Sequence, residues 1–158
     1  MRLISSSVRT MLNVVAVSAL MLASICAHAS LGGAATTVSA DSAALRGQLH
    51  STALVQYDVQ EIDSSASTVR EYVTRAGQVF AVTWQGIAPP DLAQLLGQYF
   101  PQLQAATAQA SHGAGAHRHF SVAGNDVVLQ SVARQRDFHG IAYVPSLVPA
   151  GVDTHQLP

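Results

Sequence analysis

The most constraining feature of this sequence is a period-two alternation of apolar and polar residues in three segments, at residues 57–60, 69–73 and 80–84. Short breaks rich in serine, or containing glycine, separate the segments, at residues 63–67 and 75–77. Period-two segments joined by hairpin-length connections are typical of an antiparallel β-meander. We expect Phe80, Val82 and Trp84 to share the face that points to the core, while the other face can meet water.

The period changes after Pro89-Pro90-Asp91. Six apolar side chains then follow at helical spacing: Leu92, Leu95, Leu96, Tyr99, Phe100 and Leu103. Proline in the first turn suits the start of a helix. Pro101 should kink this helix or divide it in two, because it removes a backbone donor and clashes with the preceding turn. The apolar stripe predicts a helix packed across the meander.

The remaining segments complete an α+β fold: an antiparallel β-meander with one amphipathic kinked helix packed on it, followed by a second antiparallel hairpin set. The second set comprises a hairpin with a Gly124-Asn125 turn and a further strand at residues 138–144. Residues 30–54 are expected to form an N-terminal arm with a short helix near residues 41–49. We place a single α+β domain at residues 55–148 and an extended C-terminal tail at residues 149–158.

The first 29 residues have the pattern of a cleaved secretory signal peptide. A nearly unbroken apolar run, Met11–Ile25, follows two arginines and leads to the small-x-small site Ala27-His28-Ala29. The run is shorter than the roughly 20 apolar residues that span a bilayer comfortably. We therefore expect cleavage after Ala29 and export to the periplasm or the extracellular space. The only cysteine, Cys26, would leave with the signal peptide.

Charge is sparse, and the chain contains no lysine. After the signal peptide there are six arginines and nine acidic residues, with no basic stripe of the kind that nucleic-acid-binding proteins carry. From residue 111 onward, however, three arginines accompany five histidines. Imidazoles titrate near pH 6.5, so this half could become cationic in mild acid and bind an anionic polymer or another envelope component.

Three histidines lie close together in "SHGAGAHRHF", residues 111–120. On a strand that contains Phe120 and Val122, His117 and His119 would share a face and could form a metal-binding pair. A divalent metal needs further ligands, which His112, His139 or Asp137 could supply. The alternative is a solvated loop and strand edge, since a short histidine-rich tract is a weak metal signal. The candidate metal residues are His117, His119 and His139.

The sequence contains no recognisable catalytic motif. There is no G-x-S-x-G serine and no H-E-x-x-H helix, and Gly113-Ala114-Gly115 does not fit a dinucleotide-binding loop. Acidic residues could face each other across the first hairpin as a glycosidase pair would, but polar residues at period two more simply form the wet face of a sheet. These acidic residues are Asp58, Glu61, Asp63 and Glu71.

A non-enzymatic binding or accessory protein is therefore the leading hypothesis, with no catalytic or cofactor-binding residue assigned. Its contact surface could lie near Tyr72, Trp84 and Arg136, although these residues could equally serve in packing. The alternative is a small periplasmic metal-binding protein or metal-dependent hydrolase that uses the histidine-rich segment at residues 112–119.

Four blocks of the sequence resemble a family of small exported proteobacterial proteins that is catalogued only as a domain of unknown function. The blocks are "SLGG", "VREYVTRAGQVFAVTWQG", "PDLAQLLGQYF" and "FHGIAYVPSLVPAGV". They occur in this order and cover nearly all of the chain after residue 29. The resemblance implies a signal peptide, one compact domain and an extracytoplasmic location. It implies no activity and assigns no site residue.

Overall fold

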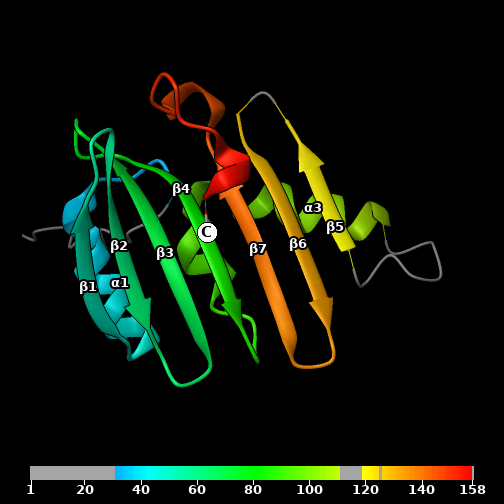
Figure 1. Ribbon diagram of the computed structural model, residues 1–158. Helices are drawn as coiled ribbons and strands as arrows, with labels where there is room; N and C mark the ends of the chain where they lie inside the picture. The colour runs from blue at the N-terminus through cyan, green and yellow to red at the C-terminus, as the bar shows by residue number, and fades with distance from the viewer. Residues whose placement is uncertain (1–30, 111–118, 125, 158) are drawn as a thin grey trace, which may run out of the picture.

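The computed structural model describes residues 31–110, 119–124 and 126–157 (Figure 1). Within them, seven strands form one antiparallel sheet in the order β1-β2-β3-β4-β7-β6-β5. The strands are β1 (Gln48–Ala53), β2 (Tyr57–Asp63), β3 (Ser67–Thr74), β4 (Val79–Gly86), β5 (His119–Ala123), β6 (Val128–Arg134) and β7 (Asp137–Tyr143). The predicted α+β fold, with a meander followed by a second hairpin set, is confirmed.

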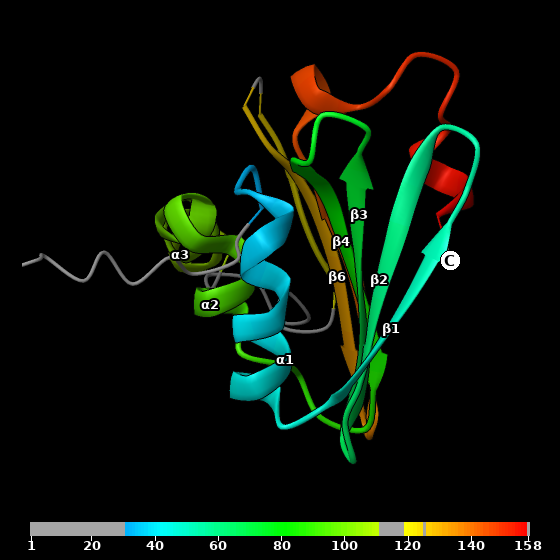
Figure 2. The same cartoon turned by 90° about the vertical axis from the view of Figure 1, so that its left-hand side faces the viewer.

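The three α-helices of the described residues lie on one face of the sheet (Figure 2). They are α1 (Val38–Leu45), α2 (Leu92–Leu96) and α3 (Phe100–Ala110). Four short 3₁₀ turns accompany them: η1 (Ala35–Thr37), η2 (Gly97–Tyr99), η3 (Pro145–Leu147) and η4 (Thr154–Gln156). The C-terminal segment, residues 148–157, lies on the opposite face, which we call the open face (Figures 1 and 2). None of the described helices is long and apolar enough to cross a membrane.

The helix predicted after Asp91 is divided in two, but the break lies earlier than Pro101. The Asp91 carboxylate caps α2 by accepting hydrogen bonds from the backbone nitrogens of Ala93 and Gln94, at 3.0 and 3.2 Å. The helix then breaks at Gly97, whose φ of 49° and ψ of −118° are accessible to glycine and costly for other residues. Pro101 falls in the first turn of α3, where its missing N–H costs no helical hydrogen bond.

The main core lies between the helices and the sheet. Its buried members include Leu31, Val38, Ile62, Val69, Val73, Val82, Trp84, Leu95, Leu96, Leu129 and Ala142. Trp84 pairs with Gly140 of the neighbouring strand. A Cβ on Gly140 would lie 2.3 Å from the Cζ2 atom of Trp84. The position therefore has to be glycine, because the indole occupies the space that a side chain would need.

A second apolar cluster lies on the open face. Tyr57, Tyr72 and Phe80 pack their rings with centroids 5.7–6.1 Å apart. Val148, Val152 and Leu157 of the C-terminal segment cover these rings. The residues expected to form an extended tail thus form a third layer, and this face does not simply meet water.

Phe80 does not share a face with Val82 and Trp84, so the expected grouping of these three side chains is wrong. The register between β3 and β4 shifts by one residue, with Tyr72 opposite Ala81 but Val73 opposite Val79. A β-bulge leaves one residue extra and reverses the alternation on one side of it. As a result Phe80 joins the open-face cluster, while Val82 and Trp84 stay in the main core.

The N-terminal part differs from the expected arm. The helix α1 begins at Val38 and ends before Arg46, which adopts a left-handed conformation with φ 53°. Strand β1 follows directly and forms one edge of the sheet. This strand was not predicted because every one of its side chains is exposed, so the sequence carries no apolar alternation there.

Candidate binding groove

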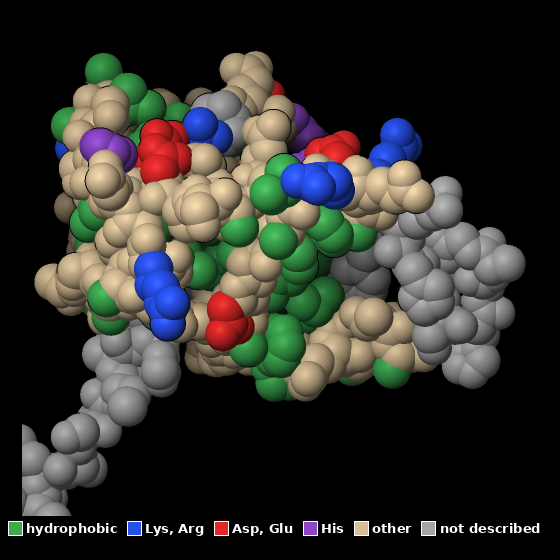
Figure 3. All heavy atoms as spheres, turned by 90° about the horizontal axis from the view of Figure 1, so that it is seen from below, with side chains coloured by type: hydrophobic (Ala, Val, Ile, Leu, Met, Phe, Trp, Pro, Cys, Tyr) green, Lys and Arg blue, Asp and Glu red, His purple; other side chains and the backbone are tan. Residues whose placement is uncertain are grey.

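A groove of about 600 Å³ opens on the open face, between the sheet and the C-terminal segment. Four strands supply its floor and sides through Arg70, Thr83, Gln85, Gln130, Val132, His139 and Ile141. Thr154, His155 and Leu157 of the C-terminal segment close one side. Seen from one end of the strands, several charged and histidine side chains lie along one edge of the molecule, and apolar side chains gather toward its middle (Figure 3).

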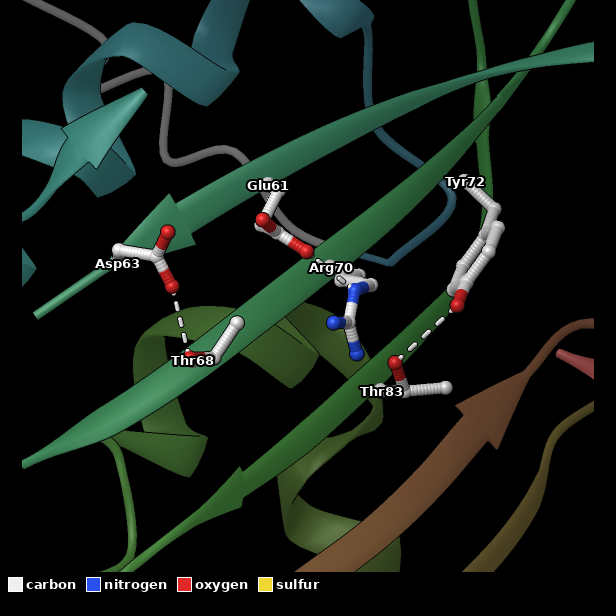
Figure 4. Close-up of polar contacts among 6 residues, drawn as sticks. All are labelled: Glu61, Asp63, Thr68, Arg70, Tyr72 and Thr83. Atoms are coloured by element: carbon white, nitrogen blue, oxygen red, sulfur yellow. Dashed lines mark hydrogen bonds and ion pairs between the residues drawn. The ribbon is translucent and has the colours of Figure 1, made fainter. Parts of the chain in front are cut away.

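Arg70 lies at the end of the groove nearest β2. Its partner is Glu61, which stands directly opposite on the neighbouring strand. Nε of Arg70 donates to Oε2 of Glu61 at 2.5 Å. Both terminal nitrogens of the guanidinium lie on the side away from Glu61, and one of them points toward Thr83 (Figure 4).

The floor beside Arg70 carries two hydroxyl groups. Tyr72 and Thr83 lie 3.3 Å apart, measured from the phenolic oxygen to Oγ1, and both are buried. Burial raises the pKa of the Tyr72 hydroxyl above its usual value, while its hydrogen bond with Thr83 and the nearby Arg70 charge act in the opposite direction. These hydroxyls provide neutral donors and acceptors next to the cation.

An imidazole–carboxylate pair lies at the other end of the groove. Nδ1 of His139 is 3.1 Å from Oδ1 of Asp137, two residues earlier on β7. Arg70 aligns through Thr83 with Ile141. Asp137 is four residues from Ile141 along β7, or about 13 Å at strand spacing. The groove therefore has a cation at one end and a carboxylate at the other.

The structure does not bring the predicted metal ligands together within the described residues. His117 lies outside the described residues. His119 begins β5 and pairs with Val132, which in turn pairs with His139. The backbones at His119 and His139 are thus two strand spacings apart, about 10 Å. In the described part of the chain, no three His, Cys, Asp or Glu residues gather as a metal-binding group.

The three predicted contact residues do not form one exposed surface. Tyr72 is 0% exposed and Trp84 is 3% exposed, and they pack on opposite faces of the sheet. Arg136 is exposed in the turn between β6 and β7, with φ 59°. Tyr72 packs in the open-face cluster, whereas Trp84 packs in the main core and also lines the groove.

The four acidic residues of the first hairpin also separate. Asp58 pairs with Arg75 at 2.9 Å, Glu61 pairs with Arg70, and Asp63 accepts a hydrogen bond from Thr68 at 2.7 Å (Figure 4). Each of these carboxylates thus has its own partner. Glu71 points to the helix side of the sheet, so the hairpin does not build a facing pair of carboxylates.

Glu71 instead forms a buried acid pair with Asp41 of α1, which the sequence analysis missed. The two residues are 1% and 0% exposed. Burial, the charge of Asp41 and a hydrogen bond with Asp41 together raise the pKa of Glu71 to about 9, with burial the largest cause. Gln94 of α2 donates to Oδ1 of Asp41 at 2.5 Å. One signal was available: Glu71 stands between Val69 and Val73 in the apolar register of β3.

The sequence matches a protein-family model over residues 27–157, which is most of the chain. No curated protein matches it. No solved structure matches it. The match spans every described strand and helix and the groove, and it confirms the resemblance to a domain of unknown function. The chain belongs to the family described as "Protein of unknown function (DUF2844)".

Proposed function

We propose that the protein is an exported, non-enzymatic binding protein that holds a small molecule in the groove on the open face. The observation that carries this proposal is the groove itself. Its volume of about 600 Å³ falls in the range of small-molecule sites. Its walls combine apolar side chains such as Ile141 and Leu157 with a few polar groups, the usual composition of a ligand site.

The partners of the polar groups in the groove support a binding function rather than a catalytic one. Arg70 is ion-paired with Glu61, and the His139 ring contacts the Asp137 carboxylate through Nδ1. A nucleophilic enzyme needs a hydroxyl or thiol hydrogen-bonded to its base. Among the described residues, no serine or threonine hydroxyl is hydrogen-bonded to the His139 ring. Groups fixed on neighbouring strands of a sheet suit recognition of one ligand shape.

Export is supported by the sequence before the sheet. The apolar run Met11–Ile25 and the small-x-small site ending at Ala29 form a signal-peptide pattern. The family match begins at residue 27, so it leaves the apolar run outside the shared domain. A protein that is exported in this way would meet its ligand outside the cytoplasm.

The groove can be tested by filling it. Ile141→Trp places a large side chain on the groove floor, and Thr52→Trp places the same side chain on the exposed edge strand as a control. A library of small polar and amphipathic molecules is screened by thermal melts of the wild type. A ligand at a hundred times its Kd should stabilise the wild type and Thr52→Trp by about 2.7 kcal/mol.

Ile141→Trp should lose this stabilisation while it keeps the circular dichroism spectrum of the wild type. Two results would contradict the proposal: no compound stabilises the wild type, or the same compounds stabilise Ile141→Trp equally well.

A further inference from the structure

We propose that the ligand of the groove carries an oxyanion group, a carboxylate or a phosphate, and that the guanidinium of Arg70 binds this group. The inference rests on the proposed binding function of the groove and specifies the chemistry of its occupant. It is argued from the orientation of Arg70, from the polar floor beside it and from the contrast with Arg75.

The orientation of Arg70 is set in advance by its neighbour. A guanidinium has five N–H donors, and Glu61 accepts from the one on Nε. The two terminal nitrogens, which carry the other four donors, lie on the side away from Glu61, and one of them points toward Thr83 on the groove floor (Figure 4). Within the described residues, the side chain of Arg70 makes no other hydrogen bond or ion pair. This leaves a planar pair of terminal nitrogens, which matches the geometry of a carboxylate or phosphate.

The guanidinium of Arg75 is oriented differently from that of Arg70. It too is ion-paired with a carboxylate of β2, Asp58, but through Nη1. Its Nη2 donates to the backbone oxygens of Leu54 and Val55. The terminal nitrogens of Arg75 are therefore occupied within the chain, and this arginine fastens the loop between β1 and β2. Only Arg70 lines the groove and presents its terminal nitrogens to it.

The surroundings of Arg70 favour an anion over a neutral group. Its side chain is 29% exposed, so a ligand can reach it while much of the solvent is kept away. Charge-assisted hydrogen bonds are stronger than neutral ones, and partial burial strengthens them further. The hydroxyl of Thr83 can complete the oxyanion site. The carboxylate of Asp137 stands more than a Debye length away at physiological salt, so it repels the anion only weakly.

The remainder of the groove indicates what the anion is attached to. Ile141 and Leu157 supply apolar surface beyond Thr83, and His139 and His155 supply imidazole rings. A flat or partly apolar body bonded to the oxyanion would lie along these side chains. The ligand class is therefore a small organic acid or organic phosphate, rather than inorganic phosphate alone.

The test uses four one-ring probes that differ in charge: benzoate, phenyl phosphate, benzyl alcohol and benzylamine. Each is titrated into the ¹⁵N-labelled protein while backbone amide signals are followed. We expect both anions to shift the amides of Arg70, Thr83 and Ile141. They should bind at least about tenfold more tightly than benzyl alcohol, the factor that one charge-assisted pair supplies. Benzylamine should bind most weakly.

Three variants assign the preference to Arg70. Arg70→Gln should lose about tenfold in affinity for the anions and keep its affinity for benzyl alcohol. Arg70→Lys, which keeps the charge but not the planar pair of nitrogens, should fall between this variant and the wild type. Arg75→Gln, which removes the arginine that is ion-paired with Asp58, should bind the anions like the wild type.

The outcomes separate this inference from the proposed function. If benzyl alcohol and the anions bind in the groove with equal affinity, or if Arg70→Gln and Arg70→Lys bind the anions like the wild type, the oxyanion site is wrong and the groove remains a binding site. If no probe shifts any groove amide, the oxyanion site is wrong and the proposed function loses its support.

Discussion

Glu71 shows how much a single residue can depend on its surroundings. It occupies a core position of β3 and shares a buried contact with Asp41, so its proton is held far more tightly in the folded chain than in the unfolded one. Its pKa rises from an ordinary value near 4.5 to about 9. The folded state therefore binds more protons than the unfolded state between these two values. The contribution of Glu71 to stability is then fully present below about pH 4.5 and is lost as the pH rises toward 9.

This linkage predicts the behaviour of Glu71→Gln. The amide imitates the protonated carboxyl but cannot ionise, so the variant should show a flatter stability profile between pH 5 and 9. At pH 8 it should be more stable than the wild type. The wild-type slope from this residue can reach about 1.4 kcal/mol per pH unit. Urea unfolding at several pH values measures this slope. The fluorescence of the buried Trp84 reports unfolding, because Trp84 is the only tryptophan in the sequence.

Asp63→Asn provides the control, because Asp63 is an exposed carboxyl on the neighbouring strand. That variant should keep the pH dependence of the wild type. A Glu71→Gln variant with an unchanged slope would show that the buried pair does not hold the extra proton.

At the scale of elements, the break between α2 and α3 distinguishes the effects of a glycine and a proline, two residues that both disfavour helix interiors. The sequence drew attention to Pro101, whereas the structure places the break at Gly97. The difference arises because proline is compatible with the first turn of a helix, and only glycine readily adopts the backbone angles found at residue 97.

Two substitutions should therefore differ in cost. Gly97→Ala forces a Cβ into a strained conformation and should lower the free energy of unfolding by about 1–3 kcal/mol. Pro101→Ala leaves the first turn of α3 intact and should change it by less than about 1 kcal/mol. Chemical denaturation of both variants under one set of conditions makes the comparison. A larger loss in the free energy of unfolding for Pro101→Ala than for Gly97→Ala would contradict this prediction.

Element prediction succeeded where each strand or helix buries one face of its own. The strands β2, β3, β4, β6 and β7 and the helices after Asp91 all left a recognisable period in the sequence. The prediction failed where a strand buries no side chain or where a bulge moves a side chain to the other face of the sheet. Strand β1 exposes every side chain, and a bulge transfers Phe80 to the opposite face. Neither property is visible in a local pattern, because the first depends on hydrogen bonding to β2 and the second on the register with β3.

At the scale of the whole molecule, the sheet, the helices and the C-terminal segment form three layers (Figure 2). If residues 1–29 act as a cleaved signal peptide, the mature protein should begin at Ser30. Expression of the full chain in a bacterium with a periplasm, followed by fractionation and N-terminal sequencing, measures this. Ala29→Leu should leave the leader uncleaved, since the cleavage site needs a small residue.

Ala34→Leu, outside the cleavage site, should be processed like the wild type. Recovery of a soluble cytoplasmic chain that retains residue 1 would contradict the export proposal.

The candidate groove is formed by segments that lie far apart in the sequence, and this is why the sequence analysis did not find it. Sequence reasoning named His139 and listed Glu61 among the acidic residues, but it sought a metal cluster and a carboxylate pair. The groove instead joins Arg70 of the first meander to His139 of the second hairpin set, with His155 of the C-terminal segment beside them. No spacing along the chain relates these three residues.

By itself, the sequence determined the fold class, most of the strands, the position of the main helical region and the leader pattern. Each of these follows from the periodicity of a short stretch, because burial of one face is a local requirement on neighbouring residues. The tertiary structure decided the pairing of β4 with β7, the direction of Phe80, the contact of Asp41 with Glu71 and the groove beside Arg70. These depend on contacts between distant segments, whose register is set by the packing of the whole sheet.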